Sequence, residues 1–558
     1  MQSLLAMKIF ALALRAAPLA FLIVFFFYPL AVILRVSFAP DGSLDFFSAR
    51  DLLSDPYYAR VLAFTFFQAA LSTLLTLLAA FPAAYIFSHY RLPASNGLRA
   101  LITIPFLMPT IVIAAAFNAL LGPRGGFNEL LMRAFQLSEP PIDLLDTIWI
   151  IFIAHVFYNF SIAFRIVSQF WSTLSPHYRD AARVLSASRA RAFFHVTLPL
   201  LMPAIVAAAL LIFIFDFTSF GVILLLGGAR FATLEVEIYR QTVNLFNLPL
   251  AATLSLLQII CTSGSMLLYA RVNARVARPL ALRPSNIARR KPQTAREKIF
   301  VFLTLALTLI FLSAPLVTLT SESFITRDGL SWQNYAALFE NVRGSITFVP
   351  PIDAVRNSLA FAAIAVALAL MLGIGAAYSI KERSGHASLR DTFYMLPLGT
   401  SAVTLGFGFL IALDRPPLAL RATIYLVPIA HALVAFPFVV RALVPILRSI
   451  KPQLRDAARV LGASPARVWR AIDLPIIARA LIVGGIFAFV ISLGEFGATA
   501  LIALPEFPTM PLAIYRLLGE PGIAHYGQAV AMSVILMVVS ALAIILLERF
   551  RVGDVGEF

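Results

Sequence analysis

The chain has 558 residues, of which 60% are hydrophobic and 13% are charged, and its formal net charge is +16. A soluble domain is nearer to half apolar and a quarter charged, so this composition excludes an ordinary soluble protein and indicates an integral membrane protein. The basic residues lie between apolar runs, which is typical of membrane-flanking loops and argues against a nucleic-acid groove. The single cysteine, Cys261, excludes an internal disulfide framework.

Twelve apolar runs are long enough to cross the hydrocarbon layer as helices, because about twenty residues are enough. The first run is long for a signal peptide and lacks a clear small-residue cleavage site, so we expect it to stay as an uncleaved helix. The runs are Ala17–Phe38, Val61–Phe87, Leu101–Leu121, Ile148–Ser168, Leu198–Leu226, Leu250–Tyr269, Ile299–Leu319, Asn357–Ile380, Thr392–Leu413, Ile424–Leu447, Leu474–Ile502 and Ala529–Leu547.

The loops between these runs alternate in charge. One set is basic and includes Arg91, the 271–298 linker and the segments around Arg179 and Arg455, whereas the other set is mixed or acidic. The positive-inside rule places the basic set in the cytoplasm, and with twelve spans both chain ends are then cytoplasmic. The linker holds one acid, Glu297, and three prolines that prevent a long helix. We expect it to be a tether near anionic lipid headgroups rather than a specific ligand site.

A charged segment occurs twice in this apolar chain. The sequence RDAARVL spans residues 179–185 and again residues 455–461, and a Leu-Pro pair follows each copy at the same distance. His155 and His431, like Tyr239 and Tyr515, are separated by the same 276 residues. Two halves with equal numbers of spans are parallel repeats, which an axis along the membrane normal relates.

Each copy has the pattern of a short helix outside the bilayer. Pro176 and Pro452 suit a first helical turn, and the acids that follow lie where the helix dipole favours a carboxylate. Small alanines allow another surface to approach closely, and Gly462 can end the second helix with a positive φ. We expect the chain to return to the membrane at Leu198 and Leu474.

At these residues the chain resembles the permease subunits of type I binding-protein-dependent ABC importers. Their cytoplasmic signature is Glu-Ala-Ala, a glycine four residues after the second alanine, and a later Ile-x-Leu-Pro. The second copy matches with Asp456 for the glutamate, and the first copy has Ser186 in place of the glycine. In the family this segment is the coupling helix, which docks on a cytoplasmic ATPase. The resemblance implies these contact residues: Arg179, Asp180, Ala181, Ala182, Ser186, Arg455, Asp456, Ala457, Ala458 and Gly462.

Two such units in one chain resemble the fused permeases of the ferric-iron and thiamine branch. The resemblance implies an all-α polytopic protein of the bacterial cytoplasmic (inner) membrane, with two parallel six-helix repeats that each carry a cytoplasmic coupling helix. The implied divisions are 1–56 and 299–353 for the first helix and external loop of each repeat, 57–270 and 354–548 for the permease domains, 271–298 for the linker and 549–558 for a cytoplasmic tail. The implied partners are two copies of an ABC ATPase, a periplasmic or lipid-anchored binding protein and the lipid bilayer, without nucleic acid.

No stretch of the chain matches the phosphate-binding pattern G-x-x-x-x-G-K-[ST]. We therefore expect no cofactor in this chain, with ATP and Mg²⁺ on the partner subunit. No catalytic or metal-ligand arrangement indicates an enzyme, and we expect His155 and His431 to pack between helices.

Two acids, Asp216 and Glu495, fall inside expected spans, where a carboxylate costs about 2.5–3.5 kcal/mol on insertion scales. In the repeat register each acid lies opposite a serine, and each half has its acid and serine three residues apart on one expected helix face. They either line a path for a cation or serve as a structural pair. The candidate pathway residues are Asp216, Ser219, Phe220, Ser492, Glu495 and Phe496. The candidate external gate residues, for which ordinary loop packing is the alternative, are Thr233, Tyr239, Thr509 and Tyr515.

The expected function is import of a small cationic solute, either thiamine (or its phosphates) or ferric iron, with thiamine slightly favoured. The alternative is a twelve-helix secondary transporter driven by an ion gradient. Such a transporter shares the parallel repeat but needs no duplicated docking helix.

Overall fold

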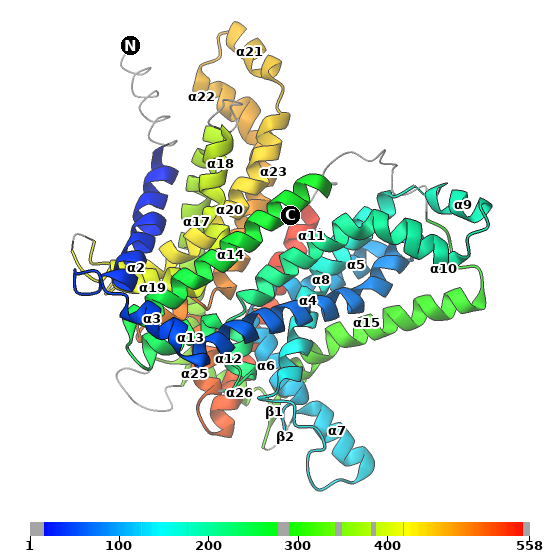
Figure 1. The fold of residues 1–558 in the computed structure, drawn as a ribbon, viewed down its shortest axis with the longest axis horizontal. Coiled ribbons are helices and arrows are strands. Elements are labelled where there is room, and N and C mark those ends of the chain that lie inside the picture. Colours follow the sequence, from blue (N-terminus) through cyan, green and yellow to red (C-terminus); the bar gives the residue numbers. More distant parts are fainter. Residues whose placement is uncertain are drawn as a thin grey trace. The chain divides into compact units, whose positions relative to one another are not determined.

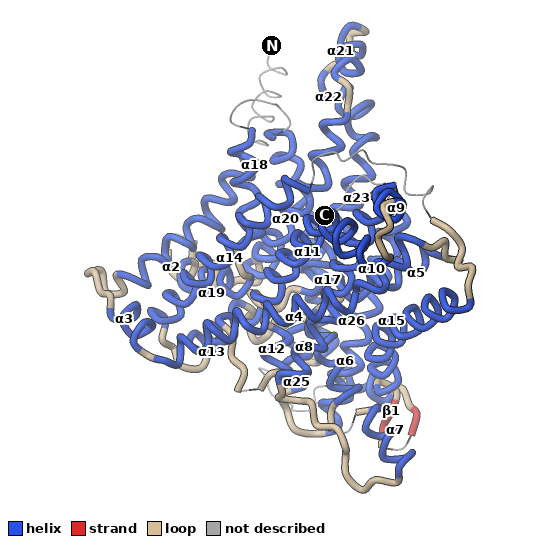
Figure 2. The backbone as a smooth tube through the Cα atoms, turned by 45° about the vertical axis from the view of Figure 1, so that its right-hand side comes forward, coloured by secondary structure: helices blue, strands red, loops and turns tan. Residues whose placement is uncertain are grey.

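The computed structural model describes residues 16–123, 125–175, 177–228, 230–276, 289–327, 329–340, 349–380, 387–416 and 418–550. Pro176 and most of the linker lie outside these residues, so the expectations for them are not described further. Within the described residues the ordered backbone is almost entirely helical (Figure 2). One small antiparallel hairpin joins β1 (Ile325–Thr326) to β2 (Gly329–Leu330). The all-α prediction is confirmed.

The number of membrane-spanning helices is also confirmed. Among the described residues, eleven helices are long and apolar enough to cross a membrane. The count becomes twelve if the pair Arg390–Gly399 and Ala402–Ala412, which is bent by 97°, is one broken span.

The helices form two compact units, and each unit contains segments of both repeats. Unit 1 consists of residues 1–54, 238–259 and 323–558, and unit 2 of residues 55–237 and 260–322. Helices α13 (Leu234–Val243) and α14 (Leu248–Val276) each run from one unit into the other.

The longer helices of unit 2 are α4 (Pro56–His89), α5 (Ser95–Thr103), α6 (Thr110–Leu121), α7 (Gly126–Phe135), α8 (Ile148–Thr173), α9 (His177–Val184), α11 (Leu198–Phe217) and α15 (Ala295–Glu322). The longer helices of unit 1 are α2 (Tyr28–Phe38), α3 (Phe47–Ser54), α17 (Pro351–Ile380), α18 (Ala387–Met395), α19 (Ala402–Ala412), α20 (Leu426–Ser449), α21 (Pro452–Val460), α23 (Leu474–Gly494), α25 (Met510–Leu518) and α26 (Ile523–Phe550). The short helical segments are η1 (Ile23–Phe27), η2 (Ile104–Leu107), α10 (Arg189–Ala192), η3 (Phe193–Thr197), α12 (Gly221–Leu226), α16 (Gln333–Ala336), η4 (Ala337–Phe339), η5 (Leu396–Gly399), α22 (Pro465–Val468), η6 (Trp469–Asp473) and α24 (Thr499–Ile502).

The core of each unit is the same three-helix packing. In unit 2, α4 packs on α8 and α11, and in unit 1, α17 packs on α20 and α23. Small residues make these contacts close: a Cβ on Gly373 of α17 would lie 2.4 Å from Cγ1 of Val439 on α20. Equivalent helices therefore build equivalent cores, as expected for a duplicated sequence.

The first spanning helix of each repeat packs in the unit that holds the rest of the other repeat. Helix α2 lies against α19, and α15 lies against α6. The approach of α2 to α19 is close, because a Cβ on Gly408 would lie 3.1 Å from Cβ of Pro29. Helix α15 also lies close to the start of α7, where a Cβ on Gly126 would lie 2.9 Å from Cγ2 of Thr318. The repeats thus exchange their first helices.

The third expected span of each repeat is broken rather than continuous. In repeat 1 the chain passes from α5 through the 3₁₀ segment η2 into α6, and in repeat 2 from α18 through η5 into α19. Pro105 and Pro397 lie at the start of these 3₁₀ segments. A proline lacks the N–H that an α-helix needs and its ring clashes with the preceding turn, which explains the break.

The fifth expected span of each repeat also ends early. Helix α11 ends at Phe217 and α12 begins at Gly221, whereas α23 ends at Gly494 and α24 begins at Thr499. The expectation that each acid and its serine share one helix face is therefore wrong, because the helix ends between them. Freed backbone groups need partners inside a membrane, and Gln68 Nε2 donates to the carbonyl of Asp216 at 2.8 Å.

At the other end, these helices begin earlier than expected. The helical path starts at Arg189 and Pro465 rather than at Leu198 and Leu474, and gives spans of 29 and 30 residues. At about 1.5 Å per residue such a helix is about 45 Å long, against a hydrocarbon layer of about 30 Å. A π-helical turn, η3 or η6, directly precedes each Leu-Pro pair and carries the helix past the proline. The excess length forms a stalk.

Candidate functional site

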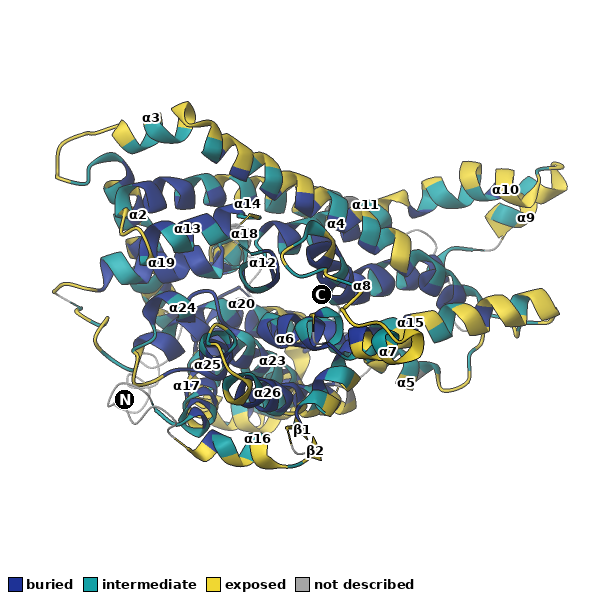
Figure 3. Ribbon diagram, turned by 90° about the horizontal axis from the view of Figure 1, so that it is seen from below, coloured by how far each residue is buried: buried dark blue, intermediate teal, exposed yellow. Residues whose placement is uncertain are grey.

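The two copies of the duplicated segment form short helices, α9 and α21, that project beyond the helices from which they extend (Figure 1). None of their residues for which burial is described is buried. Val184 and Leu185 are 84% and 83% exposed, and the matching Val460 and Leu461 are 87% and 86% exposed. Figure 3 shows α9 and α10 as mainly exposed. Each stalk thus presents an uncovered pair of apolar side chains.

Both helices end in the same turn. The N–H groups of Ala187 and Ala463 donate to the carbonyls of Ala182 and Ala458 at 3.1 and 3.0 Å, which is the long-range bond of a Schellman motif. Ser186 and Gly462 occupy the left-handed position with φ of +62° and +77°. The first copy therefore adopts the turn of the second without its glycine.

We predict that Ser186→Gly stabilises the first turn by about 0.5–1 kcal/mol. A left-handed conformation costs a residue with a Cβ about 1–2 kcal/mol, and part of this gain is lost to the greater backbone freedom of glycine in the unfolded chain. Hydrogen–deuterium exchange of residues 177–192 should slow in the variant. The matched change Gly462→Ser should accelerate exchange in residues 453–468, and equal exchange in both variants and the native chain would contradict the prediction.

The two helices differ in how they are attached. In repeat 2, Arg455 Nε lies 2.7 Å from Asp473 Oδ1 in a largely buried ion pair, and the hydroxyl of Tyr378 donates to Asp473 Oδ2 at 3.0 Å. In repeat 1 the residue that matches Asp473 is Thr197, and Arg179 instead lies 3.6 Å from its neighbour Asp180 on the surface. A buried latch therefore joins α21 to the membrane helices, and among the described residues Arg179 and Thr197 do not form the matching ion pair in repeat 1.

The contact residues expected from the resemblance divide into two groups. Asp180 and Asp456 are exposed, and Asp456 pairs with Arg459 at 3.3 Å. Ala181 and Ala457 are also exposed, so they are available to a partner. Arg455 instead pairs with Asp473 in the latch, and the sequence pattern alone does not reveal this contact.

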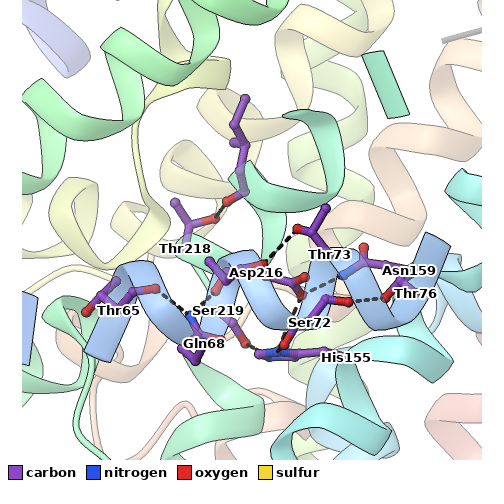
Figure 4. Close-up of polar contacts among 12 residues, drawn as sticks. Thr65, Gln68, Ser72, Thr73, Thr76, His155, Asn159, Asp216, Thr218 and Ser219 are labelled. Carbon is purple, nitrogen blue, oxygen red and sulfur yellow. Dashed lines mark hydrogen bonds and ion pairs between the residues drawn. The ribbon is translucent and has the colours of Figure 1, made fainter. Parts of the chain in front are cut away.

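In repeat 1 the acid lies in a buried polar network (Figure 4). Asn159 Nδ2 donates to Asp216 Oδ1 at 2.7 Å, and His155 Nδ1 lies 3.4 Å from the same oxygen. The other ring nitrogen, Nε2, lies 2.9 Å from the hydroxyl of Ser219, and the hydroxyl of Ser72 lies 3.0 Å from Nδ1. His155 thus joins both candidate residues of its repeat.

Repeat 2 contains the same arrangement with acid and hydroxyl exchanged. His431 Nδ1 lies 2.8 Å from the hydroxyl of Ser492, and Nε2 lies 3.2 Å from Glu495 Oε2 and 2.9 Å from Thr499 Oγ1. Glu495 also accepts from the backbone N–H groups of Ala498 at 2.7 Å and of Thr499 at 3.0 Å, at the start of α24. Its carboxylate therefore closes the break between α23 and α24.

The histidine is the residue whose role the sequence analysis missed. In each repeat the histidine contacts both the acid and the serine that lie three residues apart in sequence, although the helix ends between them. The signal was present, because His155 and His431 are separated by the same 276 residues that separate each acid from the serine opposite it in the other repeat. Asp216 and Glu495 are 1% and 6% exposed, and Phe220 and Phe496 are 6% and 3% exposed. The candidate pathway residues are therefore mostly buried in this conformation.

The candidate gate residues also occupy matching places. Tyr239 on α13 and Tyr515 on α25 are hydrogen-bonded through their side chains in unit 1, and burial together with Tyr515 raises the pKa of Tyr239. Tyr515 also packs on Phe496, with ring centroids 5.4 Å apart. Thr233 and Thr509 are instead fully buried, so their hydroxyls face the protein interior.

The helix starts beside these threonines are capped in the same way. The N–H of Leu234 donates to Thr65 Oγ1 at 3.1 Å, and that of Met510 donates to Ser358 Oγ at 2.7 Å. The repeat therefore extends to individual hydrogen bonds. Within the described residues, no group of three His, Cys, Asp or Glu side chains is arranged to hold a metal ion.

Comparison with known proteins accounts for the repeat. The family model described as "Binding-protein-dependent transport system inner membrane component" matches residues 72–278 and again residues 369–551, which together exceed half of the chain. The chain belongs to this family. It is a fused, two-repeat permease of the type I ABC importer class and a multi-pass inner-membrane protein. The match supports the importer and not the secondary transporter.

Several relatives match over nearly the whole permease. The Thiamine transport system permease protein ThiP of Escherichia coli (strain K12) is 26% identical over 84% of each chain. The protein of the same name from Brucella abortus (strain 2308) is 26% identical over 89% of this chain and 88% of its own. The Probable ABC transporter permease protein y4fN of Sinorhizobium fredii is 26% identical over 97% of this chain and 96% of its own.

Proposed function

We propose that this permease carries a small cationic solute across the cytoplasmic membrane with energy from two copies of a separate ABC ATPase, which dock on α9 and α21. A periplasmic or lipid-anchored binding protein delivers the solute on the opposite side. ATP and Mg²⁺ bind to the ATPase subunits, so this chain holds no cofactor and is not itself an enzyme. Both chain ends lie in the cytoplasm, on the side of the docking helices.

The observation that carries the proposal is the matched exposure of α9 and α21. Exposed apolar residues on a membrane protein are expected where lipid covers them, but these two pairs lie at the ends of α9 and α21, just before helices that are longer than the hydrocarbon layer requires. Apolar side chains that neither lipid nor the chain covers mark a protein interaction surface. Two such surfaces, one for each repeat, fit two identical partner subunits.

Docking is tested by Val184→Asp and Val460→Asp. Both side chains are more than four-fifths exposed, so the changes should leave the permease folded. A charge in the centre of a docked apolar patch should cost 2 kcal/mol or more, which is about a thirtyfold loss of affinity or greater. We expect each variant to retain less ATPase on copurification, and ATP-dependent uptake to fall.

The control is Leu330→Asp. Leu330 is 85% exposed on the β1–β2 hairpin, remote in sequence from either docking helix, so ATPase retention should stay at the native level. Native retention by the Val184 and Val460 variants would contradict the proposed docking role.

Thiamine (or its phosphates) is the substrate that the relatives' names support, and ferric iron is the alternative from the same branch. The two substrates are distinguished by measuring the uptake of labelled thiamine or iron into proteoliposomes that contain the permease, the ATPase and the binding protein. Uptake should require ATP on the side of the membrane where the ATPase is bound. Uptake that a proton gradient drives without ATP would overturn the proposal.

A further inference from the structure

A basic cleft lies at one end of α4. Its volume is about 300 Å³, and it is lined by Phe87, Tyr90, Arg91, Leu92, Ser95 and Arg289. The lining includes two arginines and two residues with hydroxyl groups, Tyr90 and Ser95, and no acidic residue. All of these residues belong to unit 2.

The cleft is a built feature, because the linker is fastened to the end of α4. The N–H of Arg91 donates to the carbonyl of Arg290 at 2.9 Å, and the N–H of Arg290 donates to that of His89 at 3.0 Å. The guanidinium of Arg290 also lies 5.3 Å from the ring centre of Tyr90. This short bridge fixes Arg289 beside the cleft.

The two neighbouring arginines differ in their partners. Arg290 forms a two-point ion pair with Glu297, with Nη1 3.0 Å from Oε2, and this pairing raises the pKa of Arg290. Arg289 has no such acid: its Nε is buried without a hydrogen-bond partner among the described residues, and burial lowers its pKa. A half-buried cation without a counter-charge is costly, and an anion in the cleft would remove that cost.

The start of α5 also lines the cleft, through Ser95. Its N-cap, Ala94, has no side chain that can cap the helix and adopts a left-handed conformation with φ of +53°. The first N–H groups of the helix, beginning at Ser95, therefore lack an intrahelical partner and carry the positive end of its dipole. Such an end favours phosphate oxygens.

From these contacts we infer that the cleft binds a phosphate group, which Arg289, Arg91 and the start of α5 hold together. Arginine pairs with phosphate through two parallel bonds, which suits this lining. Tyr90 directly follows the last residue of the α4 span, so the cleft lies at the end of that span that we expect to be cytoplasmic. An anionic lipid headgroup and a soluble phosphate compound share the required chemistry.

The test uses the purified full-length permease in detergent. Phosphatidylglycerol, phosphatidylcholine or glycerol 3-phosphate is added, and bound molecules are counted by native mass spectrometry while the thermal midpoint is followed. We expect phosphatidylglycerol to be retained and to raise the midpoint. Arg289→Gln and Arg91→Gln should each weaken retention about ten- to hundredfold, because each removes a charge-assisted bond.

The control is Arg296→Gln, which removes an exposed charge from the same linker without altering the cleft. Arg289→Lys keeps the charge but loses the two-point geometry and should retain the ligand partly. Stabilisation by glycerol 3-phosphate with the same dependence on Arg289 would assign the site to a soluble phosphate compound. Equal binding of all three additives, or Arg289→Gln binding as well as Arg296→Gln, would overturn the inference.

Discussion

Asp473→Ala is expected to destabilise the attachment of α21 by about 3–5 kcal/mol and to uncouple ATP hydrolysis from uptake. The change removes the acid that Arg455 and Tyr378 both contact. The guanidinium of Arg455 then stays largely buried without a counter-charge. Removing one partner of a buried ion pair is strongly destabilising for this reason. Hydrogen–deuterium exchange of residues 452–473 should rise by orders of magnitude, and more ATP should be hydrolysed per solute imported.

The other repeat supplies the control for this prediction. Thr197→Ala changes the matching residue, which forms no comparable ion pair, and should alter the exchange of α9 and the coupling ratio little. Replacing both charged partners with apolar residues, as in Arg455→Met with Asp473→Leu, should recover much of the lost stability because no charge is left unpaired. If Asp473→Ala behaved like Thr197→Ala, the latch would have no energetic role.

Glu495→Ala should lower the free energy of unfolding by about 3–5 kcal/mol. The carboxylate accepts two backbone N–H groups and lies beside His431, and each buried group left without a partner costs about 1–3 kcal/mol. Glu495→Gln should lose less, since its carbonyl can still accept from Ala498, but its NH₂ group then faces the N–H of Thr499. Unfolding in a denaturing detergent or by heat measures both variants.

Ser219→Ala is the matched change in repeat 1. It removes one hydroxyl from His155 and leaves the carboxylate of Asp216 with its amide donor from Asn159. The loss should be about 0.6–1 kcal/mol, the usual worth of one hydrogen bond between membrane helices. A Glu495→Gln variant that was fully stable but did not transport a cation would assign Glu495 to the pathway instead of the helix break.

The sequence predicts the helical class, the twelve spans and the two parallel repeats because these depend on long apolar runs and on a repeated motif, which are local properties. It also predicts the two short helices α9 and α21 at the right places along the chain. The turn at Ser186 is less predictable, because serine rarely adopts the left-handed conformation that the Schellman motif requires there.

The helix breaks at Asp216 and Glu495 cannot be predicted from hydropathy. Hydropathy continues through both positions, and the break becomes stable only because His155, His431 and Gln68 arrive from other helices. The latch between Arg455 and Asp473 is likewise a contact across 18 residues of sequence, which the motif spacing does not encode. Such partners appear only when the packing of α4 and α17 on their neighbours is known.

The exchange of first helices sets the order in which this permease can be completed during synthesis. Helix α6 emerges from the ribosome well before α15, so its packing face has only lipid or the insertion machinery beside it until residue 322 has been made. Helix α2 lacks its packing partner for longer still, because α19 is not complete until Ala412 has been made. A chain that stops after the first repeat therefore lacks one helix of unit 2 and leaves α2 without its partner. Unit 2 has all its helices only after α15, the first helix of the second repeat, has been made, and unit 1 needs the rest of that repeat.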